Sequence, residues 1–144
     1  MSKEKAIGFQ LVDITTEQFA MVKENYTKET ETSLKTGIDF KIDIENNIIG
    51  CDASFIFSQE EKMFLLLEVG CHFNVKKKDW EGFETDGKLV VPKYFLEHLA
   101  VLTIGTARGV MFAKTENTQF SQFIVPTINV TLLIKEDGIF MSEE

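Results

Sequence analysis

The sequence predicts an α+β domain in which an antiparallel meander of strands precedes one long helix. Residues 38–45 alternate apolar and polar side chains, and two further apolar runs, 48–58 and 63–75, follow after short polar turns. Residues 93 to about 114 then place apolar side chains on more than one helical stripe, behind Pro92, which suits the first turn of a helix. Strands that precede a separate helix are typical of this fold class.

Length and composition indicate one domain with more apolar side chains than its core obviously needs. The chain has 144 residues, which suits a single domain over 1–144, and 44% of them are apolar. Phenylalanine, at 13 residues against two tyrosines and one tryptophan, supplies apolar area without a polar group. This excess predicts either a dense core or apolar surface reserved for a partner.

The charge excludes some classes of partner. The formal net charge is −8, and an acidic domain repels the phosphate backbone, so we expect no nucleic acid partner. The only basic cluster, Lys76-Lys77-Lys78, is interpreted as a solvated turn. We recognise no secretory leader and no apolar stretch of membrane-spanning length, and therefore expect a cytoplasmic protein without membrane insertion.

The first third of the chain is predicted to hold one strand and a crossing loop. Residues 7–14 alternate as a strand does, whereas residues 15–34 are polar and indicate a long loop, with a second strand left open near 19–22. Asn46-Asn47 predicts a two-residue hairpin turn, because asparagine tolerates positive φ.

The strand over 63–75 is predicted to be covered on both faces. One face is apolar throughout, and the other carries Phe64 and Leu66 beside the polar Glu68, His72 and Asn74. A strand with apolar residues on both faces expects cover on both sides. The chain's own helix can cover one face, and a partner is a candidate for the other.

The charged segment 76–88 is predicted to be a loop. Trp80 and Phe83 interrupt it. Isolated aromatic side chains in such a loop usually fold back onto the body of the protein, where apolar surface is available.

The C-terminal segment contains one ambiguous element. Asn129 can cap a short final helix, but the β-branched residues that follow leave helix and strand both open for 127–134. Residues 136–144 are polar and acidic and are expected to form a loose tail.

The long helix also predicts a contact between subunits. It is apolar nearly all round, which indicates burial on most sides, and a subunit interface is a natural place for that burial in a small chain. Gly105 and Gly109 share one face, and each costs about 1 kcal/mol relative to alanine, so we expect a compensating close approach, with a bend as the competing explanation. The candidate interface residues are Leu99, Leu102, Gly105 and Gly109.

Catalytic and metal-binding patterns are not recognised. Cys51 and Cys71 fall within strand-like runs and are interpreted as small buried side chains, with a disulfide between neighbouring strands left open. His72 adjoins Cys71, but successive strand residues point to opposite faces, so the two do not share a metal ion. Asp39 and Asp43 lie on a wet strand face. We therefore expect no enzyme activity and no cofactor.

Five short motifs occur in one order along most of the chain: Phe9-Gln10-Leu11-Val12-Asp13-Ile14; Phe64-Leu65-Leu66-Leu67-Glu68-Val69 with Phe73 after it; Pro92-Lys93-Tyr94-Phe95; Arg108-Gly109; and Pro126-Thr127-Ile128-Asn129. In order and spacing, this set resembles the SecB chaperones and their SecB-like relatives. It is similar to that family's first and fourth strands, its long helix and the start of its last helix.

The resemblance implies a four-stranded antiparallel sheet with a long helix and a short C-terminal helix on one face. It also implies dimers that stack through the long helices into a tetramer. The implied activity is that of an ATP-independent holdase for unfolded or preprotein chains, which bind by burial of apolar side chains and by edge-strand hydrogen bonds. The candidate groove residues are Phe40, Phe55, Phe57, Trp80 and Phe83.

The chain departs from the family at positions that concern export. Glu68 matches one acidic position that docks the SecA motor, but Gln18 and Val22 stand where other acidic residues are expected. The tail, ending Ser142-Glu143-Glu144, lacks the docking sequence, and Tyr26 is the nearest aromatic to the family's tryptophan. Chaperone activity is thus better supported than transport through SecA, and a dedicated chaperone of one toxin–antitoxin pair is an alternative.

Two other function classes remain as alternatives. The first is an oligomeric interaction module that binds one folded partner and has no affinity for unfolded chains. The second, ranked well behind, is a small-ligand carrier or thioesterase-like enzyme in which a helix wraps a sheet. That enzyme would need His98 or Glu97 as its polar catalytic group.

Overall fold

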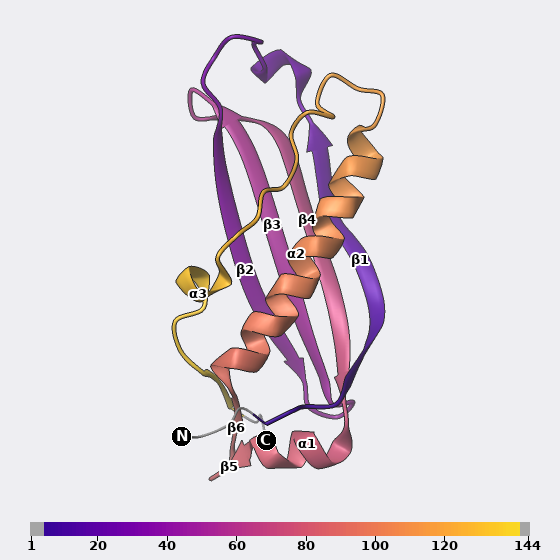
Figure 1. Ribbon diagram of the computed structural model, residues 1–144, viewed down its shortest axis with the longest axis vertical. Coiled ribbons are helices and arrows are strands. Elements are labelled where there is room, and N and C mark those ends of the chain that lie inside the picture. Colours follow the sequence, from indigo (N-terminus) through magenta and orange to yellow (C-terminus); the bar gives the residue numbers. More distant parts are fainter. Residues whose placement is uncertain (1–4, 142–144) are drawn as a thin grey trace.

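The computed structural model describes residues 5–141 and consists of a four-stranded antiparallel sheet, a smaller three-stranded sheet and helices (Figure 1). The elements in chain order are β1 (Phe9–Met21), the 3-10 turn η1 (Lys23–Asn25), β2 (Ser33–Asp43), β3 (Ile48–Gln59), β4 (Lys62–Val75), α1 (Lys77–Phe83), β5 (Glu84–Thr85), β6 (Lys88–Val91), α2 (Lys93–Thr115), α3 (Val130–Leu133) and β7 (Gly138–Met141).

The larger sheet has the strand order β1-β4-β3-β2 with every pair antiparallel. Two hairpins join β2, β3 and β4, as the alternating segments predict. The strand before them, β1, pairs with β4, so the chain crosses from one edge of the sheet to the other between β1 and β2 (Figure 1). The predicted α+β class, four-stranded antiparallel sheet and long helix are confirmed.

Both edge strands are longer than expected. Most of the segments 7–14 and 19–22 belongs to one strand, β1, which starts at Phe9 and ends at Met21, and β2 begins at Ser33 instead of Ile38. Register shifts against β4 place Val12 and Glu17 as extra residues on β1. The polar threonines between them were interpreted as loop because they break the apolar alternation, but pairing with β4 supplies the hydrogen bonds that hold them in the strand.

A bulge in β4 corrects the face assigned to Phe64. The register against β3 passes from Phe57 opposite Leu65 to Ser58 opposite Met63, which leaves Phe64 as the extra residue. Phe64 is fully buried and its ring lies 5.0 Å from that of Tyr26. The sheet face away from α2 therefore carries less apolar surface than strict alternation predicts.

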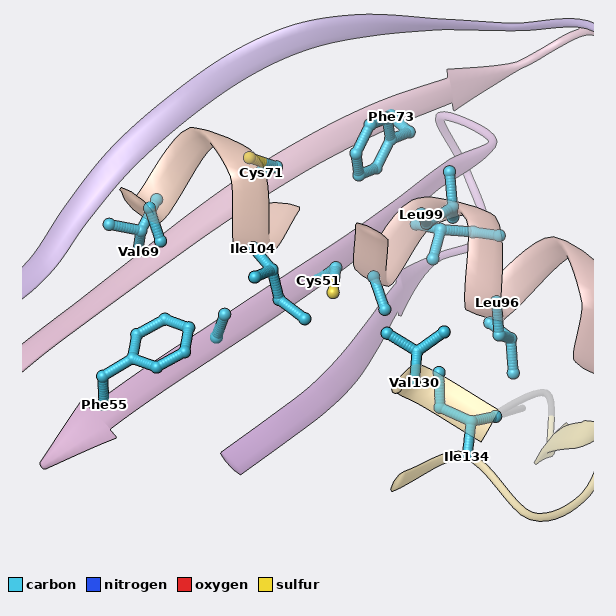
Figure 2. Close-up of a cluster of buried hydrophobic side chains, with 14 of the residues drawn as sticks. Cys51, Phe55, Val69, Cys71, Phe73, Leu96, Leu99, Ile104, Val130 and Ile134 are labelled. Carbon is cyan, nitrogen blue, oxygen red and sulfur yellow. The ribbon is translucent and has the colours of Figure 1, made fainter. Parts of the chain in front are cut away.

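Helix α2 lies diagonally across the sheet and packs on β3 and β4 (Figure 1). Buried side chains of the sheet and of α2 pack together between the sheet and the helix, and Val130 and Ile134 lie beside them (Figure 2). The inward residues of α2 are Phe95, Leu96, Leu99, Ala100, Thr103, Ile104, Ala107, Met111 and Thr115. By length and composition α2 could also cross a membrane, a test that the core helix of a globular protein passes as well.

The crossing loop is held by an aromatic cluster and by one buried amide. The ring of Tyr26 lies within 6 Å of three phenylalanine rings, with centroid distances of 5.0, 5.2 and 5.7 Å to Phe64, Phe120 and Phe123. Gln59, which is 4% exposed, accepts a hydrogen bond from the amide of Thr27 and donates to the carbonyl of Thr30 and the hydroxyl of Thr32.

The segment predicted as a charged loop over 76–88 instead contains a helix and a hairpin. In α1, Trp80 and Phe83 are spaced three apart and both enter the core, as expected. Asp86 and Gly87 have positive φ and form the turn between β5 and β6. The Asp-Gly pair was an available signal for a hairpin, but its strands are too short to show alternation.

Two further local predictions need correction. The β2–β3 connection is a four-residue turn, 44–47, because the Asp43 carboxylate accepts hydrogen bonds from the amide and side chain of Asn46 and so ends the strand early.

The tail expected over 136–144 is not loose throughout, since β7 pairs with β6. Its residues 142–144 lie outside the described part.

The open question over 127–134 is resolved as a short helix, α3. The Asn129 side chain accepts a hydrogen bond from the amide of Thr131, which is the capping contact that the sequence allowed. Val130 and Ile134 then enter the core beside α2 (Figure 2).

We predict that Gln59→Leu lowers the free energy of unfolding by about 1–3 kcal/mol, because the polar groups of the crossing loop lose their buried partner. Chemical denaturation measures the change, and hydrogen exchange should quicken over residues 22–32 first. Gln10→Leu, at an exposed position of β1, is the matched control. Equal destabilisation by both variants would contradict the assigned role of Gln59.

Candidate functional site

A groove runs between the free edge of the sheet and the C-terminal segment. It has a volume of about 460 Å³ and is lined by β2, α2 and the chain from α3 to β7. Its lining residues are Ile38, Asp39, Phe40, Leu96, Leu133, Ile134, Lys135, Glu136, Gly138, Ile139 and Phe140. We call this surface the Phe40 groove. It combines an apolar floor with three charged side chains, the arrangement that suits an extended peptide.

Gly138 allows the C-terminal segment to lie close to α2. A Cβ atom at this position would come within 2.8 Å of the Phe140 ring and 2.9 Å of Leu96 Cδ1. Leu96 is buried, so it has little room to give way. The C-terminal segment that forms one wall of the Phe40 groove can therefore lie this close to α2 only because residue 138 is a glycine.

Exposed apolar side chains continue along this wall. Ile139 is 62% exposed and Leu133 is 39% exposed, and both line the Phe40 groove. Leu132 and Met141, on the same two elements, are still more exposed. A cluster of large exposed side chains beside a groove indicates a surface that binds another molecule.

The edge of β2 adds main-chain groups to the same groove. Because β2 ends the strand order of the four-stranded sheet in residues 5–141, its outer edge can hydrogen-bond to an added strand. Main-chain hydrogen bonds give such an added strand affinity with little dependence on sequence, and adjacent pockets take its alternate side chains.

A second apolar surface is the outward side of α2. Val101 and Phe112 are about half exposed, and Leu102 is also exposed. A groove of about 380 Å³ lies between this face and Ile124. Its other lining residues are Gly105, Arg108, Gly109 and Phe112.

The two glycines on this face make no close packing contact that would require a glycine among residues 5–141. A Cβ atom at Gly109 would meet nothing within 4 Å, and one at Gly105 would meet only the Arg108 guanidinium at 4.0 Å. The guanidinium of Arg108 donates hydrogen bonds to the carbonyls of Val125 and Pro126, at 2.7 and 2.9 Å, and so holds the neighbouring loop against α2. The structure shows no kink-forming contact at either glycine among the described residues, which favours close approach by another surface.

Four of the five predicted groove residues are buried, which corrects their assignment to an exposed groove. Phe55, Phe57, Trp80 and Phe83 are at most 5% exposed. Phe57 joins the aromatic cluster near Phe64. The Trp80 and Phe83 rings lie 6.1 Å apart, and the Phe83 ring lies 6.0 Å from that of Phe95 in α2. Large aromatic rings gain most when they are fully buried, and this small core takes them up. Phe40 alone is partly exposed, in the groove named after it.

The predicted interface residues separate into two faces of α2. Leu99 is fully buried against the sheet and cannot contact another subunit, which corrects that assignment. Leu102, Gly105 and Gly109 lie on the outward side. Leu99 and Leu102 point in different directions because three residues fall short of a full turn of 3.6 residues.

The sheet face away from α2 is polar. Glu68 lies there, half-buried, opposite Gln18 on β1 and Ser54 on β3. The ammonium of Lys41 lies 3.1 Å from the carboxylate of Asp52, and this hydrogen bond raises the pKa of Lys41. Gln18, which pairs with Glu68 across the two strands, is uncharged.

Residues 5–141 contain a histidine–carboxylate pair, in which His72 Nδ1 lies 3.7 Å from Asp13 Oδ2. No three histidine, cysteine, aspartate or glutamate side chains there are arranged to hold a metal ion. His98 stacks edge-on against Phe9 at 5.6 Å, and Glu97 lies 3.6 Å from the ammonium of Lys93. His98 thus has an aromatic neighbour, whereas Glu97 Oε2 is buried without a hydrogen-bond partner among the described residues and has only the ion pair with Lys93.

The residues that sequence reasoning missed are Leu133, Ile139 and the wall around Gly138. They lie in the segment interpreted as an ambiguous element and a loose tail. The run Gly138-Ile139-Phe140-Met141 is apolar, and this was the available signal. Its partner strand, β6, is only four residues long and gave no pattern of its own.

Comparison with known proteins assigns no family. No family model matches the chain, and no curated protein matches it. Among solved structures, it is similar to a protein of unknown function from Streptococcus agalactiae. That likeness has 14% identity and a TM-score of 0.37, covers 87% of this chain and 99% of the other, and carries no argument about function.

We predict that acrylamide quenches a tryptophan at position 40 more strongly than Trp80. Trp80 is the only tryptophan and is 3% exposed, so its emission should be blue-shifted and protected. Phe40→Trp in a Trp80→Phe chain places the reporter in the groove. Stronger quenching of Trp80 would contradict the assignment of Phe40, and not Trp80, to the accessible surface.

Proposed function

We propose that this protein is an ATP-independent holdase of the SecB type, which binds extended segments of unfolded polypeptide in the Phe40 groove. The observation that carries the proposal is the coincidence of an apolar groove with the free edge of β2. An apolar floor and a row of main-chain hydrogen-bonding groups recognise unfolded chains in general, since every chain offers both.

The energetics of this groove suit a holdase. Each large apolar client side chain that becomes fully buried contributes about 1.5–3 kcal/mol. A volume of about 460 Å³ accommodates only a few side chains, so the affinity of one groove for one segment stays modest. Modest affinity allows release of the client, and several grooves on one assembly would restore tight overall binding by avidity.

The topology is consistent with the resemblance noted in the sequence. A four-stranded antiparallel sheet with a long helix and a short C-terminal helix on one face was implied by the SecB-like motifs. Arg108, from the Arg-Gly motif, holds the loop after α2, and Asn129, from the Pro-x-x-Asn motif, caps α3. The motif residues thus have local structural roles, which supports the SecB-like assignment as a proposal.

Assembly is the second part of the proposal. We assign the outward face of α2 to contact with a second copy, because Val101, Leu102 and Phe112 are exposed there and the two glycines leave room for another helix. Close approach at small residues lets helices pack at short range. Transport through SecA is not part of the proposal, given the lone Glu68.

We predict that the protein suppresses light scattering when a guanidinium-denatured, slow-folding protein is diluted into buffer without nucleotide. Ile139→Asp should weaken suppression at least several-fold, since it places a charge in the Phe40 groove. Val12→Asp is the matched control, because Val12 is exposed on β1 at the other edge of the sheet.

Equal loss in both variants would remove the groove from the proposal. Absence of suppression by the folded, oligomeric wild-type protein would instead favour the interaction module with one folded partner. Binding of reduced, carboxymethylated lactalbumin, which stays unfolded, separates these outcomes, because an interaction module should not bind it.

We predict that Gly109→Leu shifts the protein from oligomer to monomer in size-exclusion chromatography with light scattering. The added side chain meets no atom of its own chain, so the fold should tolerate it, whereas a second helix packed on this face would clash. Gly82→Leu is the control, since a Cβ atom at Gly82, in α1, also meets nothing within 4 Å. An unchanged oligomer in Gly109→Leu would place the interface elsewhere.

A further inference from the structure

The two cysteines of the chain lie directly opposite each other at the centre of the sheet. The register of β3 against β4 pairs Cys51 with Cys71. Both side chains are fully buried on the face covered by α2, and they are not joined by a disulfide. Figure 2 shows them on the two neighbouring strands, with Ile104 of α2 close by.

This pairing meets the backbone requirement of a disulfide. Directly opposed residues of an antiparallel pair have Cα atoms about 4.5–5.5 Å apart. Disulfides span Cα separations of roughly 4.4–6.8 Å, so the Cα spacing of this pair lies within their range. Cysteines in neighbouring strands seldom share both face and register by chance, because a slip of one residue would place them on opposite faces.

Helix α2 seals the pair from solvent. The hydroxyl of Thr103 contacts both thiols, and that of Thr106 contacts Cys71. Burial raises the pKa of Cys51 to about 12 and also raises the pKa of Cys71, and these hydroxyl contacts only partly oppose the effect. A protonated, covered thiol is a poor nucleophile, so the closed structure protects both cysteines.

We propose that Cys51 and Cys71 form a redox modification site, a dithiol that a small-molecule disulfide oxidises to a cross-strand disulfide when α2 moves off the sheet. This proposal does not rest on client binding in the Phe40 groove. The opening step is local, since α2 covers the pair from one side while β3 and β4 remain paired beneath it.

The chemistry requires one disulfide oxidant, such as glutathione disulfide. One cysteine thiolate attacks it, forms a mixed disulfide and releases one glutathione thiolate. The second cysteine then attacks the protein-bound sulfur, the cross-strand bond forms, and a second glutathione leaves. The two cysteines lose two electrons and two protons in total, and the oxidant becomes two molecules of the thiol.

The test is the rate of oxidation of the folded protein by glutathione disulfide at mildly alkaline pH. Intact mass should fall by two hydrogen atoms, and both thiols should be lost together. The rate should level off as the oxidant concentration rises, because opening of α2 becomes limiting. Leu99→Ala, which removes a fully buried α2 contact, should raise the rate about tenfold or more. Leu132→Ala, at an exposed position, is the matched control and should leave it unchanged.

Further variants keep the proposal open to refutation. If circular dichroism shows Leu99→Ala to be unfolded, the milder Ile104→Val replaces it and should still raise the rate. In the Cys71→Ser chain, the product should be a single glutathione adduct at Cys51. Two products would overturn the proposal: a chain with two glutathione adducts and no cross-strand disulfide, or a disulfide between two chains. Two rate results would also overturn it: equal oxidation rates in the wild type and in the folded variant of Leu99 or Ile104, or no oxidation of that folded variant.

Discussion

The apolar face that β4 presents to α2 is the contact on which the rest of the structure depends. Its buried side chains are Phe64, Leu65, Leu67, Val69, Cys71, Phe73 and Val75. Each large one contributes about 1.5–3 kcal/mol by burial, more than a typical hydrogen bond adds. Because β4 also pairs with β1 and β3, the same strand organises both the helix above and its neighbours alongside.

Because α2 covers only one face of the sheet, the remaining surface of the protein has both polar and apolar regions. The face of the sheet away from α2 meets water and carries ion pairs such as Lys41 with Asp52. Apolar side chains that the single covering layer cannot bury remain at its margins, on the outward side of α2 and on the segment from α3 to β7. These margins are where an added strand or a second subunit would bury further area, since burial of apolar area drives most association.

Helix α2 connects the core to these margins. Its inward residues cover the dithiol and the sheet, while its outward residues include the small Gly105 and Gly109. A displacement of α2 would therefore expose two buried thiols and alter the outward face at the same time. The coupling follows from the rigid helix, which cannot move one face without the other.

The sequence by itself determined the meander, the long helix and the polar turn at Glu60-Glu61, because hydrophobic periodicity reports which side chains face a core. It also placed Gly105 and Gly109 on one face of the helix. Only the tertiary structure decided the rest. The bulge at Phe64, the continuity of β1 and the pairing of β7 with β6 depend on contacts between residues far apart in the chain. The burial of Phe55, Phe57, Trp80 and Phe83 was decided in the same way. An aromatic residue type indicates only that a side chain prefers burial. Whether it is buried in the core or exposed in a groove depends on its neighbours from other elements.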